Sequence, residues 1–138
     1  MKKRGFGAGN WNGAGGKVDD KLEETIEEAL VRETKEEVGV EVKDFYKVGE
    51  IEFIFPEKTA WDQLVHVYLA KDWVGKPQES DEMRPRWFTI EEIPYEEMWS
   101  SDAHWLPKVL SKKLVKAKFL FDNEFAIQDH HLTTVDSL

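Results

Sequence analysis

The sequence predicts a single α/β domain in which a mixed or mostly antiparallel β-sheet lies between helices. Apolar residues recur at helical spacing between Leu22 and Val38, and apolar and polar residues alternate from Ile51 to Phe55. Neither a repeat nor a Pro-rich linker divides the chain. At 138 residues, with 41% hydrophobic and 12% aromatic content, the chain can fill a real core. We therefore expect one domain over residues 1–138.

The elements are expected in the following order. Residues 1–16 contain six of the nine glycines together with aromatic side chains, which predicts a shaped loop. A helix from Leu22 to Val38 follows, with Gly39 as its C-terminal stop. Residues rich in β-branched and aromatic side chains predict strands, and a second helix and a hairpin around Asp122 and Asn123 complete the chain. The strands are expected at 40–42, 46–55, 64–70 and 86–89, the helix at 102–113, and the hairpin strands at 116–121 and 124–128.

Charge and cysteine content narrow the classes of function. With 28 acidic and 19 basic residues the net charge is -9, which argues against binding to nucleic acid polymers or anionic membranes. The absence of cysteine excludes disulfides and thiolate metal sites. No apolar run is long enough to span a bilayer. We expect a monomeric cytoplasmic protein that acts on a small molecule.

Three glutamates of the first predicted helix point to metal chemistry. Glu33, Glu36 and Glu37 lie at i, i+3 and i+4, so their side chains should leave one helix face. Their mutual repulsion would become attraction around a divalent cation, and oxygen ligands select hard ions such as Mg²⁺ or Mn²⁺ that bridge to phosphates. On charge patterning alone, a solvated Glu-rich face is the more common explanation. The neighbouring residues decide between the two.

The neighbouring residues resemble the Nudix box. In this motif a Gly precedes a Glu by five intervening residues, and Arg-Glu-apolar-any-Glu-Glu-any-Gly-apolar follows after seven more. Glu24 to Val40 follows this pattern, with Thr34 at the usually aliphatic position. Seven residues instead of five separate Gly16 from Glu24, as if two were inserted. The resemblance implies the Nudix fold and a hydrolase that depends on Mg²⁺, with Mn²⁺ as the alternative.

The resemblance also implies a role for each residue of the motif. Arg32 would orient the carboxylates by ion pairing, and Glu24 would brace the loop against the helix. Glu37 would accept the proton of the attacking water, so the implied catalytic residues are Arg32, Glu33 and Glu37. The implied metal ligands are the backbone carbonyl of Gly16 and the carboxylates of Glu33, Glu36, Glu37 and Glu82.

Segments outside the box resemble one branch of the family, the oxidised purine nucleoside triphosphatases of animals, which hydrolyse 8-oxo-dGTP and 2-hydroxy-dATP. The similar segments include residues 2–9, 11–13, 15–18 and 79–85, and the similarity extends over essentially the whole chain. In this branch Asn12 would hydrogen-bond the base and Trp99 would stack on it. From the residues alone, a place in the core is as plausible for Phe53 as contact with a ligand. A solvated position is as plausible for Lys2 as contact with the substrate. The implied substrate-binding residues are Lys2, Phe6, Asn12, Phe53, Trp99 and Asp102.

Two further features depart from that branch. Ser101 stands where the branch has the first of two adjacent aspartates that contact the purine edge, and a hydroxyl presents a different hydrogen-bonding pattern from a carboxyl group. A β-strand and its return normally precede the segment that here begins at Lys2. We therefore expect a Nudix fold without its usual first strand.

These features together predict a nucleotide-pool sanitising enzyme. It would hydrolyse oxidised purine nucleoside triphosphates to the monophosphate and pyrophosphate, by metal-assisted substitution at phosphorus. One alternative is a Nudix pyrophosphatase with another substrate, such as an unmodified or methylated purine nucleotide or a dinucleotide. A second alternative is a Nudix module that binds nucleotides without hydrolysing them. The intact set of Arg32, Glu33, Glu36 and Glu37 favours an enzyme over that module.

Overall fold

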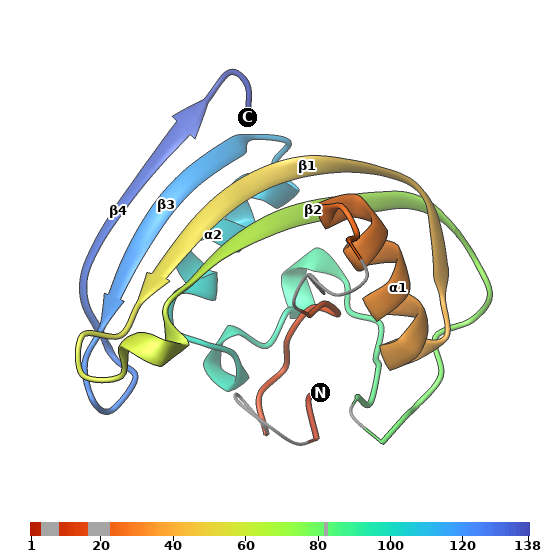
Figure 1. The fold of residues 1–138 in the computed structure, drawn as a ribbon, viewed down its shortest axis with the longest axis horizontal. Coiled ribbons are helices and arrows are strands. Elements are labelled where there is room, and N and C mark those ends of the chain that lie inside the picture. The colour runs from red at the N-terminus through yellow and green to blue at the C-terminus, as the bar shows by residue number, and fades with distance from the viewer. Residues whose placement is uncertain (4–8, 17–22, 82) are drawn as a thin grey trace. The chain divides into compact units, whose positions relative to one another are not determined.

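The computed structural model describes residues 1–3, 9–16, 23–81 and 83–138 (Figure 1). Its elements follow the order α1 (Ile26–Val38), β1 (Glu41–Ile54), η2 (Thr59–Trp61), β2 (Gln63–Val74), η3 (Ile90–Glu92), η4 (Tyr95–Glu97), α2 (Asp102–Leu110), β3 (Leu114–Phe121) and β4 (Ile127–Val135). The strands form one sheet in the order β2-β1-β3-β4. β1 pairs parallel with β3, and β3 pairs antiparallel with β4, so the expected mixed sheet is confirmed.

Helix α1 begins and ends at residues that cap it. The Thr25 hydroxyl accepts a hydrogen bond from the Glu28 N–H, and the Glu28 carboxylate accepts one from the Thr25 N–H, each at 3.1 Å. The prediction that this helix starts at Leu22 is wrong at its N-terminal end, because Glu23 has a left-handed φ of 51° and Thr25 is the N-cap. The predicted stop at Gly39 is confirmed by its φ of 74° and its N–H bond to the Lys35 carbonyl.

The strands are longer than the sequence predicts. The two strands expected at 40–42 and 46–55 are one strand, β1, because the residues between them include no Gly or Pro that would interrupt it. Similarly, β2 extends beyond the predicted segment at both ends. The hairpin of β3 and β4 is confirmed, but its second strand begins at Ile127 because residues 122–126 form the turn. The Asp122 carboxylate accepts bonds from the N–H groups of Glu124 and Ala126, which holds this turn.

Two predictions in the C-terminal half are wrong. Arg86 to Thr89 is not a strand, and Trp87 has 69% of its surface exposed, beside the Trp73 ring at 5.6 Å. The second helix ends at Leu110 rather than at Lys113, because Lys112 adopts a left-handed φ of 67°. Irregular backbone and the short helices η3 and η4 occupy the stretch before α2.

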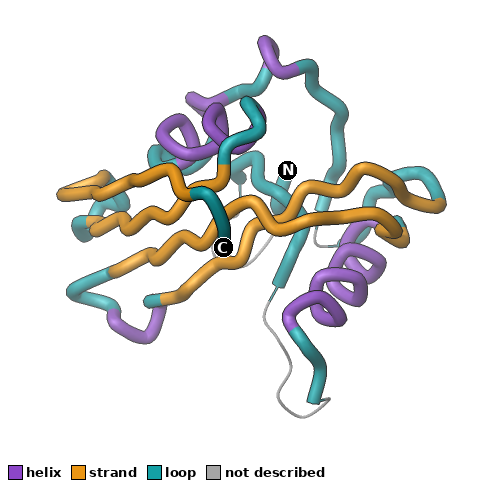
Figure 2. Tube along the Cα trace, turned by 90° about the horizontal axis from the view of Figure 1, so that it is seen from above, coloured by secondary structure: helices purple, strands orange, loops and turns teal. Residues whose placement is uncertain are grey.

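The described chain forms two compact units, each built from two segments. The first comprises Met1–Phe45 with Ala70–Met98, and the second comprises Tyr46–Leu69 with Trp99–Leu138. The core of the first unit includes Val38, Val40 and Met83. In the second unit α2 packs on β3, on one side of the strands in Figure 2. The buried hydrophobic residues of the second unit include Val48, Ile51, Phe55, Val109, Val115, Phe119 and Phe121.

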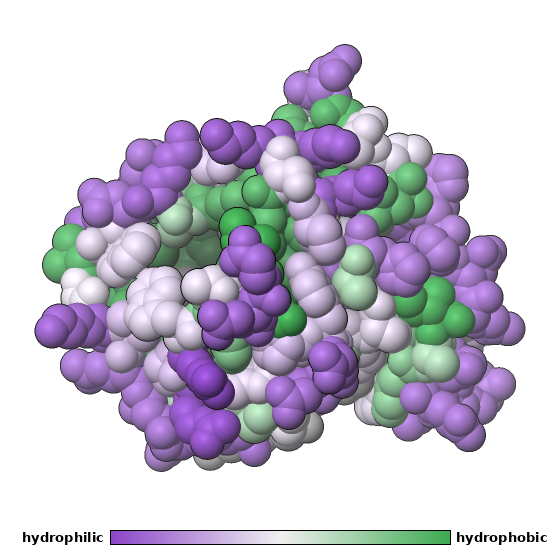
Figure 3. All heavy atoms as spheres, turned by 180° about the vertical axis from the view of Figure 1, so that it is seen from behind, coloured by the Kyte–Doolittle hydropathy of each residue, from purple (hydrophilic) through white to green (hydrophobic). Residues whose placement is uncertain are grey.

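The surface is predominantly polar. On the face shown in Figure 3, hydrophilic side chains surround smaller apolar areas, as expected for a sequence with 34% charged residues. None of the helices in the described part of the chain is long and apolar enough to cross a membrane.

Candidate active site

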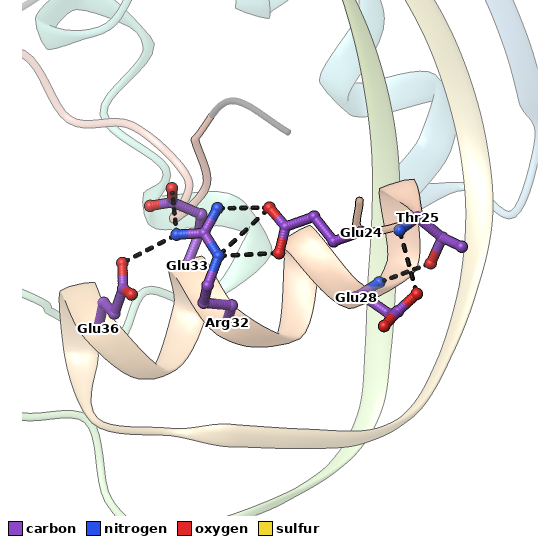
Figure 4. A network of polar contacts seen from close by, with 6 residues as sticks. All are labelled: Glu24, Thr25, Glu28, Arg32, Glu33 and Glu36. Carbon is purple, nitrogen blue, oxygen red and sulfur yellow. Dashed lines mark hydrogen bonds and ion pairs between the residues drawn. The ribbon is translucent and has the colours of Figure 1, made fainter. Parts of the chain in front are cut away.

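Arg32 is the centre of an ion-pair network on α1 (Figure 4). Its Nη2 lies 2.6 Å from Glu24 Oε1 and its Nε lies 2.9 Å from Glu24 Oε2, which is the paired geometry that a guanidinium and a carboxylate favour. Its Nη1 donates to Glu33 Oε1 at 3.0 Å and to Glu36 Oε2 at 3.1 Å. The bond to Glu24 is the main reason that the pKa of Arg32 is raised above its ordinary value. One guanidinium therefore orients three carboxylates.

Spacing along α1 explains how these residues meet. Arg32 and Glu36 are one helical turn apart, so their side chains leave the same face. Glu24 lies just before the cap residue Thr25, and its side chain is only 7% exposed. The capping box at Thr25 therefore positions the residue that holds Arg32. The predicted bracing role of Glu24 is consistent with this geometry.

A loop that contains Gly15 and Gly16 approaches the Glu37 and Glu33 carboxylates of α1. Glu37 is buried, with 8% of its surface exposed, and its Oε2 accepts a bond from the Gly15 N–H at 3.0 Å. Gly16 lies so close to Glu33 that a Cβ added at Gly16 would overlap with the Glu33 carboxylate. Only glycine lets the backbone pass this carboxylate without displacing it. The loop at Gly15 and Gly16 thus faces the same helix as the ion-pair network.

The expected metal ligands do not form a closed cage. Among residues 1–3, 9–16, 23–81 and 83–138, no group of three or more acidic or histidine side chains is close enough to hold a metal ion. Arg32 binds Glu33 and Glu36, whereas Glu37 is bound by the loop. In this conformation the three carboxylates are divided between Arg32 and the Gly15 N–H, and their role as metal ligands stays a prediction. Glu82 and Phe6 lie outside the described residues.

Thr34 replaces an aliphatic residue of the motif without leaving its hydroxyl unpaired. The side chain is buried, and Oγ1 donates to the Leu30 carbonyl at 2.7 Å. A bond to the preceding turn is the usual way in which a helix accommodates a buried threonine. This departure from the motif is therefore compatible with an intact helix.

The first loop carries two predicted substrate residues in the same unit as α1. Lys2 is half-buried, and its backbone forms an antiparallel bridge with Met83. Asn12 is exposed, and its Oδ1 accepts a bond from the Gly13 N–H at 2.9 Å. The preceding Trp11 is buried, and its backbone N–H donates to the Glu97 carbonyl at 2.9 Å. Trp11 therefore anchors this loop and keeps Asn12 at the surface.

The second unit brings together the other three predicted substrate residues. Phe53 stacks on Phe121 with a ring-centroid distance of 6.0 Å, and Trp99 contacts Phe121 edge-on at 5.6 Å. The Asp102 N–H donates to the Trp99 carbonyl at 2.9 Å, at the start of α2. Phe53 and Trp99 are both half-buried, so each can pack in the core and still present part of its ring. Phe53 and Trp99 can therefore each pack in the core and also contact a ligand.

Asp102 is buried and carries a perturbed pKa. Burial raises the pKa of its carboxyl group to about 6, although hydrogen bonds from the Trp105 indole and the Trp99 backbone act in the opposite direction. The Trp105 Nε1 lies 3.1 Å from Asp102 Oδ1. Trp105 packs against the core, and its indole N–H orients this carboxylate. Near neutral pH the group can therefore exist both protonated and ionised.

Sequence reasoning missed the environment of Ser101 and the full extent of the aromatic set. Ser101 is fully buried, and its Oγ has no hydrogen-bond partner among the described residues. Phe55, Trp61 and Phe125 contact one another, and Phe55 and Phe125 also contact Trp99. Phe53, near the end of β1, and Phe55, just after it, belong to the alternating segment that the sequence shows, and both rings contact Phe121. Trp61 and Phe125 lie in turns and gave no periodic signal.

Comparisons with known proteins agree with the motif. A family profile described as "NUDIX domain" matches residues 1–109. "Oxidized purine nucleoside triphosphate hydrolase" of Danio rerio is 47% identical over 138 residues, which cover 100% of this chain and 86% of that protein. The protein of the same name from Mus musculus is 45% identical, over 99% of this chain and 86% of its own. The crystal structure of a MutT protein from Bacillus halodurans superposes with a TM-score of 0.80 at 27% identity, over 90% of this chain and 82% of that one.

Proposed function

Because this chain belongs to the Nudix family, we propose that it hydrolyses oxidised purine nucleoside triphosphates, such as 8-oxo-dGTP and 2-hydroxy-dATP, to the monophosphate and pyrophosphate. The names of its relatives from Danio rerio and Mus musculus support this substrate class. The observation that carries the proposal is the network around Arg32, which holds Glu24, Glu33 and Glu36 beside the glycine loop. Such a reaction would remove damaged nucleotides before they are incorporated into DNA.

Members of this family generally use a divalent metal ion, and we propose Mg²⁺ for this chain. The donors that would hold it are all oxygens, the ligand type that Mg²⁺ prefers: the carboxylates of Glu33, Glu36 and Glu37, the Gly16 carbonyl and, outside the described residues, Glu82. The close approach of Gly16 to the Glu33 carboxylate supports a shared role for these two residues. When bound, the ion would neutralise polyphosphate charge and lower the pKa of the attacking water. Mn²⁺ could substitute for it.

Each residue of the network has a distinct proposed task. Arg32 holds Glu33 and Glu36 by ion pairs, which would limit the side-chain conformations that they adopt when substrate binds. Glu37, which is buried, takes the proton of the attacking water. The water oxygen forms a bond to phosphorus, and the bond from that phosphorus to the pyrophosphate oxygen breaks. Pyrophosphate then leaves, and the nucleoside monophosphate remains.

Trp99 and Asp102 of the second unit are the residues that we propose to recognise the base. Trp99 is the proposed stacking residue, because it is half-buried and adjacent to Asp102. A base stacked on an aromatic ring gains about 1 to 3 kcal/mol. The Asp102 carboxyl can donate or accept a hydrogen bond, since its pKa lies at about 6. Lys2, Phe6 and Asn12 remain proposed contacts from the first unit.

Ser101 favours a second candidate substrate. A buried hydroxyl beside Asp102 replaces one carboxyl group of the related animal enzymes, and its oxygen has no partner among the described residues. Because an unpaired buried donor is costly, a base that offers an acceptor to Ser101 would gain a hydrogen bond. An unmodified or methylated purine nucleotide is therefore the alternative substrate that a test must include.

The test is the release of pyrophosphate from 8-oxo-dGTP, 2-hydroxy-dATP, a methylated purine nucleotide and dGTP in the presence of Mg²⁺. We expect the oxidised nucleotides to be the best substrates and Glu37→Gln to abolish their hydrolysis. Glu27→Gln, which removes the same charge from an exposed position of α1, is the matched control and should remain active. Preference for dGTP or the methylated nucleotide would favour the alternative substrate. Binding without any hydrolysis would show that the chain is a nucleotide-binding module.

We further propose that residues 1–138 act as one Nudix domain, in a monomeric cytoplasmic protein whose ligand is a small nucleotide. The matches to relatives extend over the whole chain, which supports the single domain. The net charge of -9 supports a small nucleotide rather than a nucleic acid polymer as the ligand, and the absence of cysteine supports a cytoplasmic location. Sedimentation equilibrium with and without nucleotide would measure the oligomeric state.

A further inference from the structure

Five aromatic side chains of the second unit form an aromatic cluster at one end of the sheet. Two come from the connection between β1 and β2, one from the segment before α2, one from β3 and one from the β3–β4 turn. In this order they are Phe55, Trp61, Trp99, Phe121 and Phe125. Figure 1 shows the two connections at the same end of the strands. Phe55 and Phe121 are buried, whereas the other three rings are partly exposed. The buried pair therefore serves the core, and the outer three remain available for another role.

Three rings of the cluster hold Trp99 in one orientation. Phe121 and Phe125 each lie 5.6 Å from the Trp99 ring centroid, with interplanar angles of 78° and 70°, and Phe55 lies 6.3 Å away at 81°. Edge-to-face contacts are geometrically specific, because the positive ring edge meets the negative ring face. Phe55 and Phe121 are fixed in the core, so Phe125 is the surface residue of this set. Removing the Phe125 ring would leave one side of Trp99 unsupported.

The turn that carries Phe125 adopts an unfavourable backbone conformation. Phe125 has a φ of 61°, a value that bulky L-residues rarely adopt and that Asn or Gly adopt more readily. The Asp122 carboxylate holds the turn by accepting bonds from the N–H groups of Glu124 and Ala126, at 2.8 Å and 3.0 Å. A turn that only connected β3 to β4 would be more stable with Asn or Gly at this position. The side chain at this position therefore has a use other than turn formation.

Phe125 is supported from its other side as well. The Trp61 ring stacks on it at 5.6 Å with an interplanar angle of 26°, and Lys58 Nζ lies 4.3 Å from the Trp61 ring centroid. A shallow pocket next to these rings is lined by Phe55, Lys58 and Phe125, among other residues. The order of contacts is thus Lys58, Trp61, Phe125 and Trp99. These contacts restrict the position of the Phe125 ring, although Phe125 is 37% exposed.

We propose that Phe125 is a positioning residue for nucleotide binding, which holds the Trp99 ring at the angle at which a purine stacks on it. The inference rests on the proposed function, in which Trp99 stacks on the base. Because Phe125 acts through the Trp99 ring, we expect it to affect how tightly the base is bound and not the rate of phosphate cleavage. Trp61 acts through Phe125 and has a smaller effect. The ligand recognised in this way is a purine nucleotide.

The test separates the ring of Phe125 from its backbone conformation. Phe125→Asn removes the ring and suits the left-handed backbone, so the protein should unfold at an equal or higher urea concentration. Its KM for the best nucleotide substrate, and its Kd for the corresponding nucleoside monophosphate measured by calorimetry without metal, should each rise about tenfold, as partial loss of stacking implies. Its kcat should change less than about twofold. Phe125→Tyr should restore both constants, and Glu124→Ala, in the same turn, should alter neither.

The outcomes distinguish this inference from the proposed function. If Phe125→Asn is stably folded and binds the monophosphate as tightly as the wild type, Phe125 has no positioning role and the inference is overturned. An equal loss in Phe125→Tyr would also overturn it, because a ring of the same shape would have failed to restore binding. Wild-type protein that binds the monophosphate but hydrolyses nothing would refute the proposed function, while the binding ratios would still test Phe125. Wild-type protein that binds no purine nucleotide would overturn both.

Discussion

Replacing Asp102 by asparagine should make the stability of the protein less dependent on pH between about 4 and 7. The Asp102 side chain is buried beside Trp105, and burial raises the pKa of its carboxyl group from 3.8 to about 6. The folded protein thus binds this proton more tightly than the unfolded chain does. The resulting stabilisation is fully present below pH 3.8 and is lost as the pH rises through about 6.

The size of the effect follows from the two pKa values. The difference between 3.8 and about 6, at about 1.4 kcal/mol per pKa unit, corresponds to about 3 kcal/mol of unfolding free energy. Asparagine has the same shape and cannot ionise, so Asp102→Asn avoids this loss. Any change in the bond to the Trp105 indole would shift its stability by the same amount at every pH. The difference between variant and wild type should therefore increase by up to about 3 kcal/mol from pH 4 to pH 7.5.

The measurement is urea-induced unfolding of both proteins at pH 4, 5, 6, 7 and 7.5, followed by tryptophan fluorescence. Other carboxylates titrate in both proteins and cancel in the difference between them. A difference that rises between about pH 4 and pH 6 and levels off above pH 6 would support the buried carboxyl group. A difference that stays constant across this range would refute the reasoning, because Asp102 would then titrate as it does in the unfolded chain.

Three further predictions concern other sites. Gly16→Ala should lower metal-dependent hydrolysis at least about tenfold by displacing the flexible end of Glu33, with little change in urea stability; an unchanged metal titration would contradict this. Thr25→Ala should lower the unfolding free energy by about 1 kcal/mol, since it removes a helix cap, and Thr25→Ser should restore it in the same urea assay. Ser101→Ala should raise the unfolding free energy by about 1 kcal/mol, because a buried hydroxyl without a partner is removed; lower stability would show that the hydroxyl is paired.

The motif residues were predictable because they depend on helix spacing. Arg32 and Glu36 meet on one face of α1 through a separation of four residues, which a sequence displays directly. Gly39 was likewise identified as a helix stop, since glycine adopts its left-handed backbone without strain. The start of α1 was less predictable, because it depends on two reciprocal bonds between Thr25 and Glu28 rather than on apolar periodicity.

The environment of the proposed base site could not be predicted from the spacing of residues along a helix or a strand. Trp61, Trp99 and Phe125 are separated by long stretches of sequence and meet only because β1, β3 and their connections come together in space. The predicted strand at Arg86 to Thr89 failed for a related reason. Its composition suits a strand, but these residues do not pair with any described strand of the sheet.

The sequence by itself determined the chemical identity of the candidate site, since a separation of four residues on a helix places Arg32 next to Glu36. It also determined the family, because the motif and the similarity to relatives are properties of the residues alone. Only the tertiary structure decided which carboxylate each donor binds, that Asp102 is desolvated, and that Phe125 is held against Trp99. Burial and contacts between distant residues depend on how the strands pair, and no local pattern in the chain encodes that pairing.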